Sequence, residues 1–211
     1  MQERAKISRQ QILRGAADRF EISGYGSTSM NDIVSASRMT KGAVYFHFSS
    51  KDELAQAVID EQHRISLASF SAAASTGAPA LEQVIMVCNE IARQLIADPV
   101  VRAGIRLTLE LNTADGPFEP YLTWIRELQR LADIAQQEGD IRQDVTPESV
   151  GRVVTATFTG VQMVSNVLTR RADLSERIDE LFVLLLAGVV SEKRRGDIEA
   201  LVKIRLASYV A

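Results

Sequence analysis

The spacing of apolar residues is the feature that most constrains the fold of this 211-residue chain. Apolar side chains recur at intervals of three and four residues in nearly every segment, which is the period of a helix with one buried face. Sustained alternation of apolar and polar residues, which would indicate strands, is almost absent. We therefore predict an all-α protein, long enough for one large domain or two small ones with a buried core.

Cap and turn signals divide this pattern into helices. Small hydroxyl residues, acidic residues and glycine mark the first four: Ser8 with Gln11 and a terminal Gly24, then Ser29, then Thr40, then a Ser50–Glu53 capping box for a long helix running towards Ser69. Further helices are expected over about 81–97, 99–112, 118–138, 147–169, 175–195 and 197–209, and Asp98-Pro99 and Thr146-Pro147 mark two of their starts. The small-residue stretch STGAPA at 75–80 is the best candidate for a linker.

Composition and charge indicate a folded globular chain with no overall attraction to nucleic acid. A hydrophobic share of 46% and a charged share of 24% are typical of a globular chain. The net charge of -3 gives no global attraction to nucleic acid, so any such contact must come from a local basic patch. The first nineteen residues supply one candidate, with five basic residues against two acidic ones.

Cysteine use and apolar runs indicate a cytoplasmic protein. The single Cys88 excludes an intramolecular disulfide and is expected to be a small core residue. The charged N-terminal segment does not have the pattern of a signal peptide. The most apolar run, at 181–190, is about half the length needed to cross a bilayer, so we expect a buried helix and no membrane association.

One short segment, TKGAVYFHFSSKDEL at 40–54, carries the residues best suited to chemistry. Two short helices separated by a tight break, following a longer one, form the pattern of a helix-turn-helix, whose last helix enters the DNA major groove. Gly42 allows close approach to DNA, Lys41 offers a charge, and Thr40 adds a hydroxyl. Tyr45 and His47 are expected to donate to phosphate from the outer face.

Other residues of this region have expected roles in the helix-turn-helix as well. Val44 and Phe48, four residues apart, should point inward. Lys51, in the first turn of the fourth helix, adds a charge next to free backbone N–H groups, and Thr28 and Ser29 act similarly at the second helix. The alternative from periodicity alone is that the aromatic residues of this segment are core residues and His47 is merely solvated.

The order of residues at 24–54, GYGSTSMNDIVSASRMTKGAVYFHFSSKDEL, resembles the DNA-binding domain of TetR-family transcriptional regulators. The resemblance implies a helix-turn-helix DNA-binding domain at 1–54, a connecting helix that starts there and continues to about 70, and a helical ligand-binding and dimerisation domain at 71–211. It also implies a homodimer that binds a palindromic operator in double-stranded DNA.

The second part of the chain is similar to the γ-butyrolactone receptor subgroup of that family from actinomycetes. The matching segments are VVRAGIRL at 100–107, PYLTW at 120–124 and FTGVQMVS at 158–165. The subgroup's tryptophan lines its ligand pocket, which implies roles for Trp124, Tyr121 and Phe158 here. Gly116-Pro117-Phe118 departs from the subgroup's pattern just upstream. The implied effector is a small apolar molecule such as a γ-butyrolactone, a butenolide or a furan.

Gln162 and Asn166 are spaced by four among apolar residues and place amide groups near one helix face. Packing against a polar neighbouring helix explains this pattern as well as ligand contact does. The resemblance favours ligand contact for Gln162 only.

Other chemistry finds little support in the sequence. Two histidines, His47 and His63, are too few for a histidine-rich metal site, Gly24-x-Gly26 follows a helix and lacks a third glycine, and no nucleophile is singled out. We expect no catalytic residue, metal or cofactor.

Two functions remain: a ligand-responsive repressor, or an all-helical small-molecule-binding protein or enzyme that uses its helix-turn-helix for protein contact. The apolar helices near 147–169 and 175–190 are expected to form the dimer interface, which a charge at Leu185 should disrupt.

Overall fold

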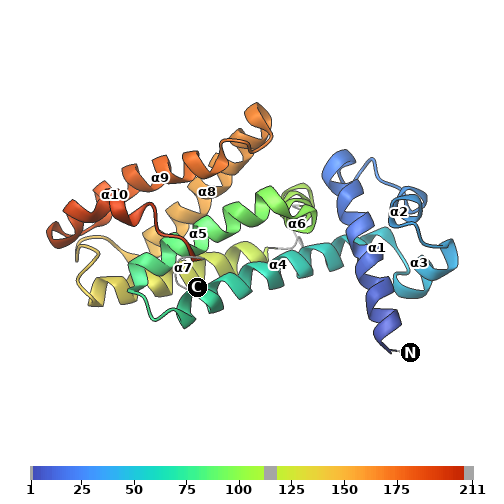
Figure 1. The fold of residues 1–211 in the computed structure, drawn as a ribbon, viewed down its shortest axis with the longest axis horizontal. Helices are drawn as coiled ribbons and strands as arrows, with labels where there is room; N and C mark the ends of the chain where they lie inside the picture. Colours follow the sequence, from blue (N-terminus) through green and yellow to red (C-terminus); the bar gives the residue numbers. More distant parts are fainter. Residues whose placement is uncertain (1, 112–117, 207–211) are drawn as a thin grey trace. The chain divides into compact units, whose positions relative to one another are not determined.

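The computed structural model describes residues 2–111 and 118–206 and shows an all-α protein (Figure 1). Its helices are α1 (Gln2–Ser23), α2 (Met30–Ser37), α3 (Lys41–His47), α4 (Lys51–Ser75), α5 (Ala80–Ala97), α6 (Pro99–Glu110), α7 (Glu119–Gln137), α8 (Pro147–Thr169), α9 (Leu174–Val189), the short 3-10 helix η1 (Glu192–Asp197) and α10 (Ile198–Leu201). The helical class predicted from apolar spacing is confirmed. Within the described residues, no helix is long and apolar enough to cross a membrane.

The chain forms two compact units. The first contains residues 1–66 and 97–118, so it combines α1, α2, α3, the first part of α4 and α6. The second contains residues 67–96 and 119–211, which include the end of α4, α5 and α7 to α10. The first unit is therefore built from two stretches that lie far apart in the sequence.

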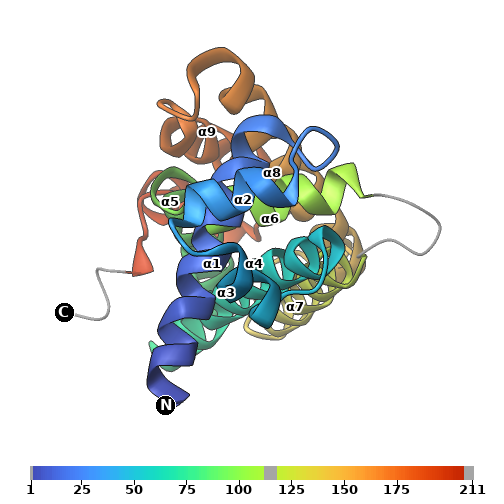
Figure 2. The same ribbon diagram turned by 90° about the vertical axis from the view of Figure 1, so that its right-hand side faces the viewer.

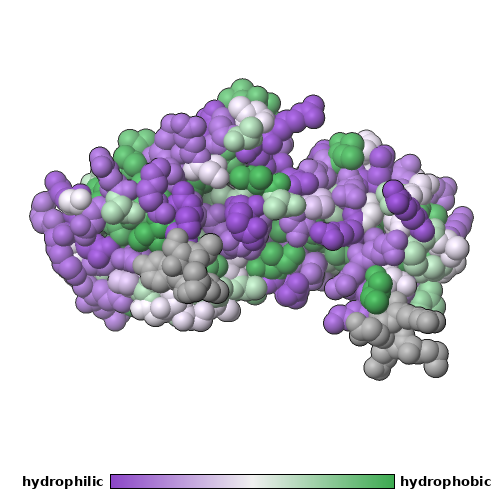
Figure 3. Space-filling model, viewed as in Figure 1, coloured by the Kyte–Doolittle hydropathy of each residue, from purple (hydrophilic) through white to green (hydrophobic). Residues whose placement is uncertain are grey.

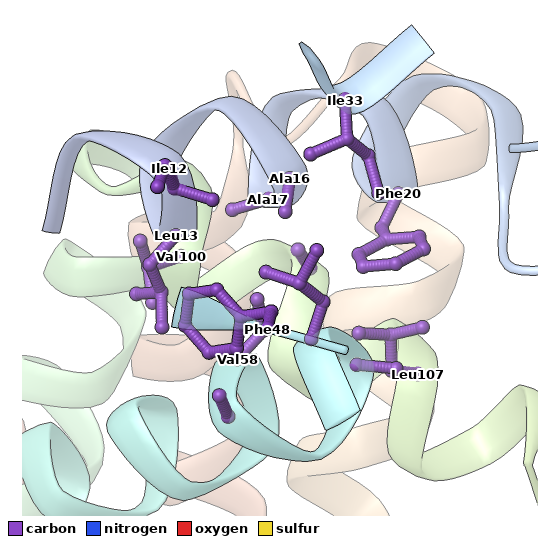
Figure 4. Close-up of a cluster of buried hydrophobic side chains, with 14 of the residues drawn as sticks. Ile12, Leu13, Ala16, Ala17, Phe20, Ile33, Phe48, Val58, Val100 and Leu107 are labelled. Atoms are coloured by element: carbon purple, nitrogen blue, oxygen red, sulfur yellow. The ribbon is translucent and has the colours of Figure 1, made fainter. Parts of the chain in front are cut away.

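The first unit has one apolar core, shown in Figure 4. The inner face of α1 supplies Ile12, Ala16 and Phe20, which are completely buried, and Ile33 of α2 and Val44 of α3 meet them. Fully burying an isoleucine, valine or phenylalanine side chain stabilises the fold by about 1.5–3 kcal/mol. The core includes residues from α6 as well: Val100, Ala103 and Leu107.

The start of α1 differs from the expectation. Ser8 lies inside the helix, which begins at Gln2, so Ser8 is not its N-cap. The helix continues through the earlier residues because most of them are good helix formers and no glycine or proline stops them. Its end is as expected: Gly24 adopts the left-handed conformation with φ of 75° and its N–H donates to the carbonyl of Phe20.

The second unit is built around the contact of α7 with α8. Gly151 makes this close packing possible, because a Cβ at that position would lie 2.5 Å from the carbonyl oxygen of Ile125. The α9 helix packs against α8 and ends at Val189, earlier than the expected 195. There the chain forms an isolated antiparallel bridge between Ile141 and Val190, which ends the helical path.

Two further expectations about helix ends are wrong. Thr146 makes no side-chain cap at α8, because its hydroxyl is hydrogen-bonded to that of Ser149 at 2.6 Å. The last helix covers only Ile198–Leu201 in place of 197–209. The expected residues 207–209, and Gly116 and Pro117, lie outside the described residues.

Candidate nucleic-acid interface and ligand site

Local side-chain bonds fix the start of α2. Ser29 and Asp32 form a complete capping box: the Ser29 hydroxyl accepts from the Asp32 N–H at 3.2 Å, and the Asp32 carboxylate accepts from the Ser29 N–H at 2.8 Å. The hydroxyl and the backbone N–H of Ser29 hold the pKa of Asp32 below its usual value. The second helix therefore begins where its cap signal predicted.

The turn between α2 and α3 is tight. Arg38 follows the last residue of α2 in the left-handed conformation, with φ of 54°. Two residues later, Thr40 caps α3, its hydroxyl accepting from the Ala43 N–H at 3.2 Å. Figure 2 shows the two short helices beside α1, with α2 above α3 in the view. This arrangement of α1, α2 and α3 is the predicted helix-turn-helix.

The α3 helix has one buried and one open face. Val44 and Phe48 are buried, as their spacing predicted, whereas Lys41 and Tyr45 are exposed. The Lys41 ammonium lies 5.8 Å from the centre of the Tyr45 ring. A Cβ at Gly42 would meet no heavy atom within 4 Å, so no neighbour in the protein requires glycine there. The glycine therefore leaves space on the outer surface of α3, where another molecule can approach.

Two residues that were expected to contact DNA make hydrogen bonds within the protein. Thr28 is only 2% exposed, and its hydroxyl donates to the carbonyl of Gly24 at 2.7 Å. Lys51 donates to the Tyr25 carbonyl at 2.9 Å and lies 4.1 Å from the centre of its ring. We therefore correct the interpretation of Thr28, because its buried hydroxyl is used by an internal contact. Lys51 is half-buried, and its one hydrogen bond leaves two N–H donors of the ammonium, so its phosphate contact stays a prediction. Ser29, Thr40 and His47 remain at the surface or partly exposed.

The start of α4 is also satisfied by its own chain. The Ser50 hydroxyl accepts from the Glu53 N–H at 3.1 Å, as expected, but the Glu53 carboxylate accepts from the N–H and hydroxyl of Ser49. These bonds hold the pKa of Glu53 below its usual value. The capping box is thus shared between two serines.

A polar network connects α6 with α4 inside the first unit. Glu110, at the end of α6, accepts from the Tyr25 N–H at 2.7 Å and pairs with Arg106. The Tyr25 hydroxyl donates to Asp52 in the first turn of α4, and this bond is the main reason that the pKa of Tyr25 is raised to about 12. Arg102 of α6 pairs in addition with Glu21 of α1. Tyr25 therefore touches both helices through different atoms.

Sequence reasoning missed two exposed residues of the helix-turn-helix. Arg38 carries a positive charge in the turn itself, and Phe46 exposes 81% of its surface on α3. The turn contains no glycine to mark its left-handed residue, so Arg38 gave no signal. Phe46 lies in a run of aromatic residues that includes the exposed Tyr45 and the buried Phe48. The sequence does not distinguish it from Phe48, and only the helix geometry shows that it is exposed.

A small apolar cavity lies inside the second unit. Its volume is about 20 Å³, which is close to the space that one water molecule needs. Helices α4, α5, α7 and α8 contribute its lining, which consists of Phe70, Val87, Cys88, Ile91, Trp124, Leu128, Val154, Thr155 and Phe158. Two of the four predicted ligand residues, Trp124 and Phe158, are therefore brought together here.

Buried polar atoms without partners occur on two of the helices that line this cavity, α7 and α8. Trp124 is 5% exposed, and its indole N–H has no hydrogen-bond acceptor among the described residues. Gln162 is 3% exposed, lies one helical turn after Phe158, and its side-chain carbonyl has no donor within the described chain. Leaving such a group unpaired costs about 1–3 kcal/mol. Asn166, by contrast, is exposed, so the two amides do not share a buried face.

The remaining cavity neighbours are less polar. Tyr121 packs edge-on against Trp124, with ring centres 5.3 Å apart, and burial raises the pKa of its hydroxyl. Burial also raises the pKa of the Cys88 thiol to about 12. A thiol with that pKa stays protonated and unreactive at neutral pH, so Cys88 is a core residue, as expected.

Helices α8 and α9 expose an unusual number of apolar side chains. Figure 3 shows apolar surface at the top of the view, where Figure 1 shows the turn from α8 to α9. The residues that are at least 42% exposed on these helices are Val153, Met163, Val164, Val167, Leu168, Val183 and Leu184. Gly160 and Gly188 lie on the same helices, and a Cβ at either would meet nothing within 4 Å. Leu185, the expected test position, is half-buried within its own protomer.

Comparison with known proteins covers both parts of the chain. Residues 12–58 match the family described as bacterial regulatory proteins, tetR family, and residues 78–191 match the tetracyclin repressor-like C-terminal domain. The chain is 32% identical to the A-factor receptor protein of Streptomyces griseus over 89% of its own length and 66% of that protein. The latter share is slightly less than two thirds of the relative's length.

Solved structures give the same result over most of each chain. A structure described as a gamma-butyrolactone receptor (ArpA like protein) has a TM-score of 0.82 and 31% identity, covering 94% of this chain and 96% of that one. The TetR family protein CprB from Streptomyces coelicolor, in complex with its biological operator sequence, has a TM-score of 0.78 and 31% identity over the same shares. On the strength of both domain matches, this chain belongs to the TetR family of bacterial transcriptional regulators.

Proposed function

We propose that this protein is a ligand-responsive transcriptional repressor that binds a palindromic DNA operator as a dimer and leaves it when a small apolar effector binds. The observation that carries the proposal is the open face of α3, where Lys41 and Tyr45 lie beside a glycine with free space outside it. Residues 1–54 would bind DNA and residues 71–211 would bind effector and dimerise. The relative in complex with its operator supports the first role.

Each proposed DNA contact follows from the chemistry of its side chain. Lys41 binds phosphate or guanine, and the hydroxyl of Tyr45 donates to phosphate. Thr40 caps α3 with its hydroxyl oxygen, which leaves its hydroxyl proton available to phosphate. The hydroxyl of Ser29 donates to the Asp32 carboxylate at 2.6 Å, so Ser29 would need to turn from this partner to bind phosphate. His47 completes the set at the end of α3. Gly42 lets the backbone come close to the groove.

The proposed effector is a γ-butyrolactone, a butenolide or a furan. It enters the cavity walled by Trp124 and Phe158, with Tyr121 and Gln162 beside it. A carbonyl of the effector would accept from the Trp124 N–H, and a hydroxyl would donate to the Gln162 carbonyl, so both unpaired groups would gain partners. The cavity of about 20 Å³ is too small for such a molecule, so the effector must select a more open state.

The dimer would form through α8 and α9. Exposed apolar residues on both helices need a partner surface, and glycine in a helix interior is about 1 kcal/mol less favourable than alanine. Because nothing in the protomer requires Gly160 or Gly188, close approach of the second protomer's helices explains their presence. Four helices, two from each protomer, would then pack as a bundle.

Release from DNA would follow a shift between two populations of the dimer. The effector prefers a state in which α4 has moved and the two recognition helices no longer match the groove spacing. Tyr25 offers a path for this movement, since it joins the end of α6 to the first turn of α4. Removing most repressor from DNA requires a preference of several kcal/mol, or roughly a thousandfold or more.

Selection from a random pool of duplexes tests DNA recognition without requiring a known operator sequence. The purified dimer should enrich a palindrome with half-sites about one helical turn or a multiple apart. Its affinity should fall steeply with salt, and Lys41→Ala should reduce that slope by about one. A chain that enriches no duplex, or shows no salt dependence, would favour the alternative of a helical binding protein or enzyme.

A further inference from the structure

Phe46 is exposed in a way that the fold does not require. It lies in the last turn of α3 with 81% of its surface accessible, while Val44 in the helix and Phe48 at its C-cap are buried. Exposing a phenyl ring to water gives no stability, and a single exposed apolar residue is common on protein surfaces. Its place on the helix, rather than its exposure alone, gives it significance.

The open face of α3 has two parallel rows of side chains. Lys41 and Tyr45, spaced by four, form a polar row, with the ammonium 5.8 Å from the ring centre. Gly42 and Phe46, also spaced by four, form an apolar row that consists of a gap followed by a phenyl ring. His47 packs edge-on against Phe46 with ring centres 5.1 Å apart and so limits the positions of the ring.

The chemistry of the two rows differs when α3 lies in a major groove. The polar row can hydrogen-bond to phosphates and to base edges. Phe46 has no donor or acceptor, so phosphate gives it nothing to bind. The C5-methyl group of thymine is the apolar group that the major-groove edge of a base pair presents, and phenylalanine is among the side chains that contact it.

We propose that Phe46 reads thymine in the operator by packing its ring against the C5-methyl group. This inference rests on the proposed function, because it requires α3 to enter the major groove. Gly42, one turn earlier, leaves the space through which the base edge reaches the ring. Phe46 is thus a specificity-determining residue in the row beside Lys41 and Tyr45, which fix the helix on the backbone.

Replacing thymine by deoxyuridine removes only the methyl group and so isolates this contact. The probe is the duplex enriched from a random pool by the parent protein, with symmetry-related thymine pairs replaced one pair at a time. Replacing the thymine pair that Phe46 contacts should weaken binding by the parent about fifteenfold, or about fourfold for each half-site. A buried methyl group contributes about that much to the affinity. The same pair should leave the affinity of Phe46→Ala unchanged within twofold.

Matched variants separate the methyl contact from general effects. Tyr45→Phe keeps Phe46 and should retain the full difference between thymine and deoxyuridine, while Phe46→Leu should retain part of it. Thermal unfolding of Phe46→Ala should match that of the parent, because the ring is 81% exposed.

Several outcomes would overturn the inference while leaving the proposed function intact. These are an enriched site without thymine, a parent that binds every deoxyuridine duplex as well as the thymine duplex, and a Phe46→Ala variant that loses affinity by the same factor for both duplexes and so keeps the parent's methyl dependence. The last result would indicate contact with sugar atoms. If the parent enriches no duplex at all, the proposed function fails, and this inference fails with it.

Discussion

Replacing Leu184 by alanine tests the proposed dimer surface with a magnitude that follows from the structure. Leu184 is 78% exposed in the protomer. Alanine lacks three of its carbons, which are worth about 2.4 kcal/mol when buried, and about 2 kcal/mol of this is gained only when a partner covers the side chain. A two-fold dimer buries the residue twice, so the substitution should cost about 4 kcal/mol, or roughly a thousandfold in the dimer dissociation constant.

Sedimentation equilibrium over a range of protein concentrations measures this change. Leu122→Ala is the matched control, since Leu122 is 43% exposed on α7, outside the proposed surface. Leu184→Ala should lose little protomer stability, because 78% of the residue is exposed, whereas Leu122→Ala should lose more, because Leu122 is 43% exposed, without changing the dimer dissociation constant. Leu185 is the weaker test, because part of it is buried within its own protomer. A Leu184→Ala dimer whose dissociation constant stays within threefold of the parent would show that α9 does not form the interface in this way.

Three further predictions concern the two units separately. Lys41→Ala and Tyr45→Phe should each weaken operator binding by about 1–3 kcal/mol in a gel-shift titration without changing the unfolding temperature, and full affinity in the double variant would remove the recognition-helix assignment. Trp124→Phe keeps most of the packing but loses the indole N–H, so about tenfold more effector should be needed to release DNA at unchanged operator affinity; release at the parent's concentration would place the pocket elsewhere. The hydroxyls of Ser165 and Thr169 lower the pKa of Asp173 from 3.8 to about 2, so its stabilising contribution is complete above pH 3.8 and is lost as pH falls towards about 2. The urea midpoint of Asp173→Asn should therefore fall less than that of the parent over this range, and parallel decreases would contradict the assignment.

Much of the fold followed from the sequence because local signals and burial agreed. The caps at Ser29, Thr40 and Asp98 are all formed by the residues that predicted them. The prediction failed where one local signal competed with another. Ser8 had the side chain of a cap, but the preceding residues extend the helix. Thr146 found a closer partner in Ser149.

The site was predictable only as far as periodicity distinguishes inside from outside. Spacing by four separated Val44 and Phe48 from Tyr45, and the structure confirms that division. It could not show that Thr28 turns back to a carbonyl or that Lys51 pairs with Tyr25, because those partners depend on how the turn after α1 closes. In the second unit, Gln162 and Asn166 share a spacing but not an environment, and only the packing of neighbouring helices decides which is buried.

The discontinuous make-up of the first unit matters for protein engineering. Two-domain regulators can be combined into hybrid proteins, in which the DNA-binding domain of one protein is fused to the ligand-binding domain of another. A single crossover near residue 70 would import α6 from the donor and separate Glu21 and Tyr25 from Arg102 and Glu110. A hybrid that carries residues 97–118 together with residues 1–66 of the same protein would keep those pairs, so the structure favours this design.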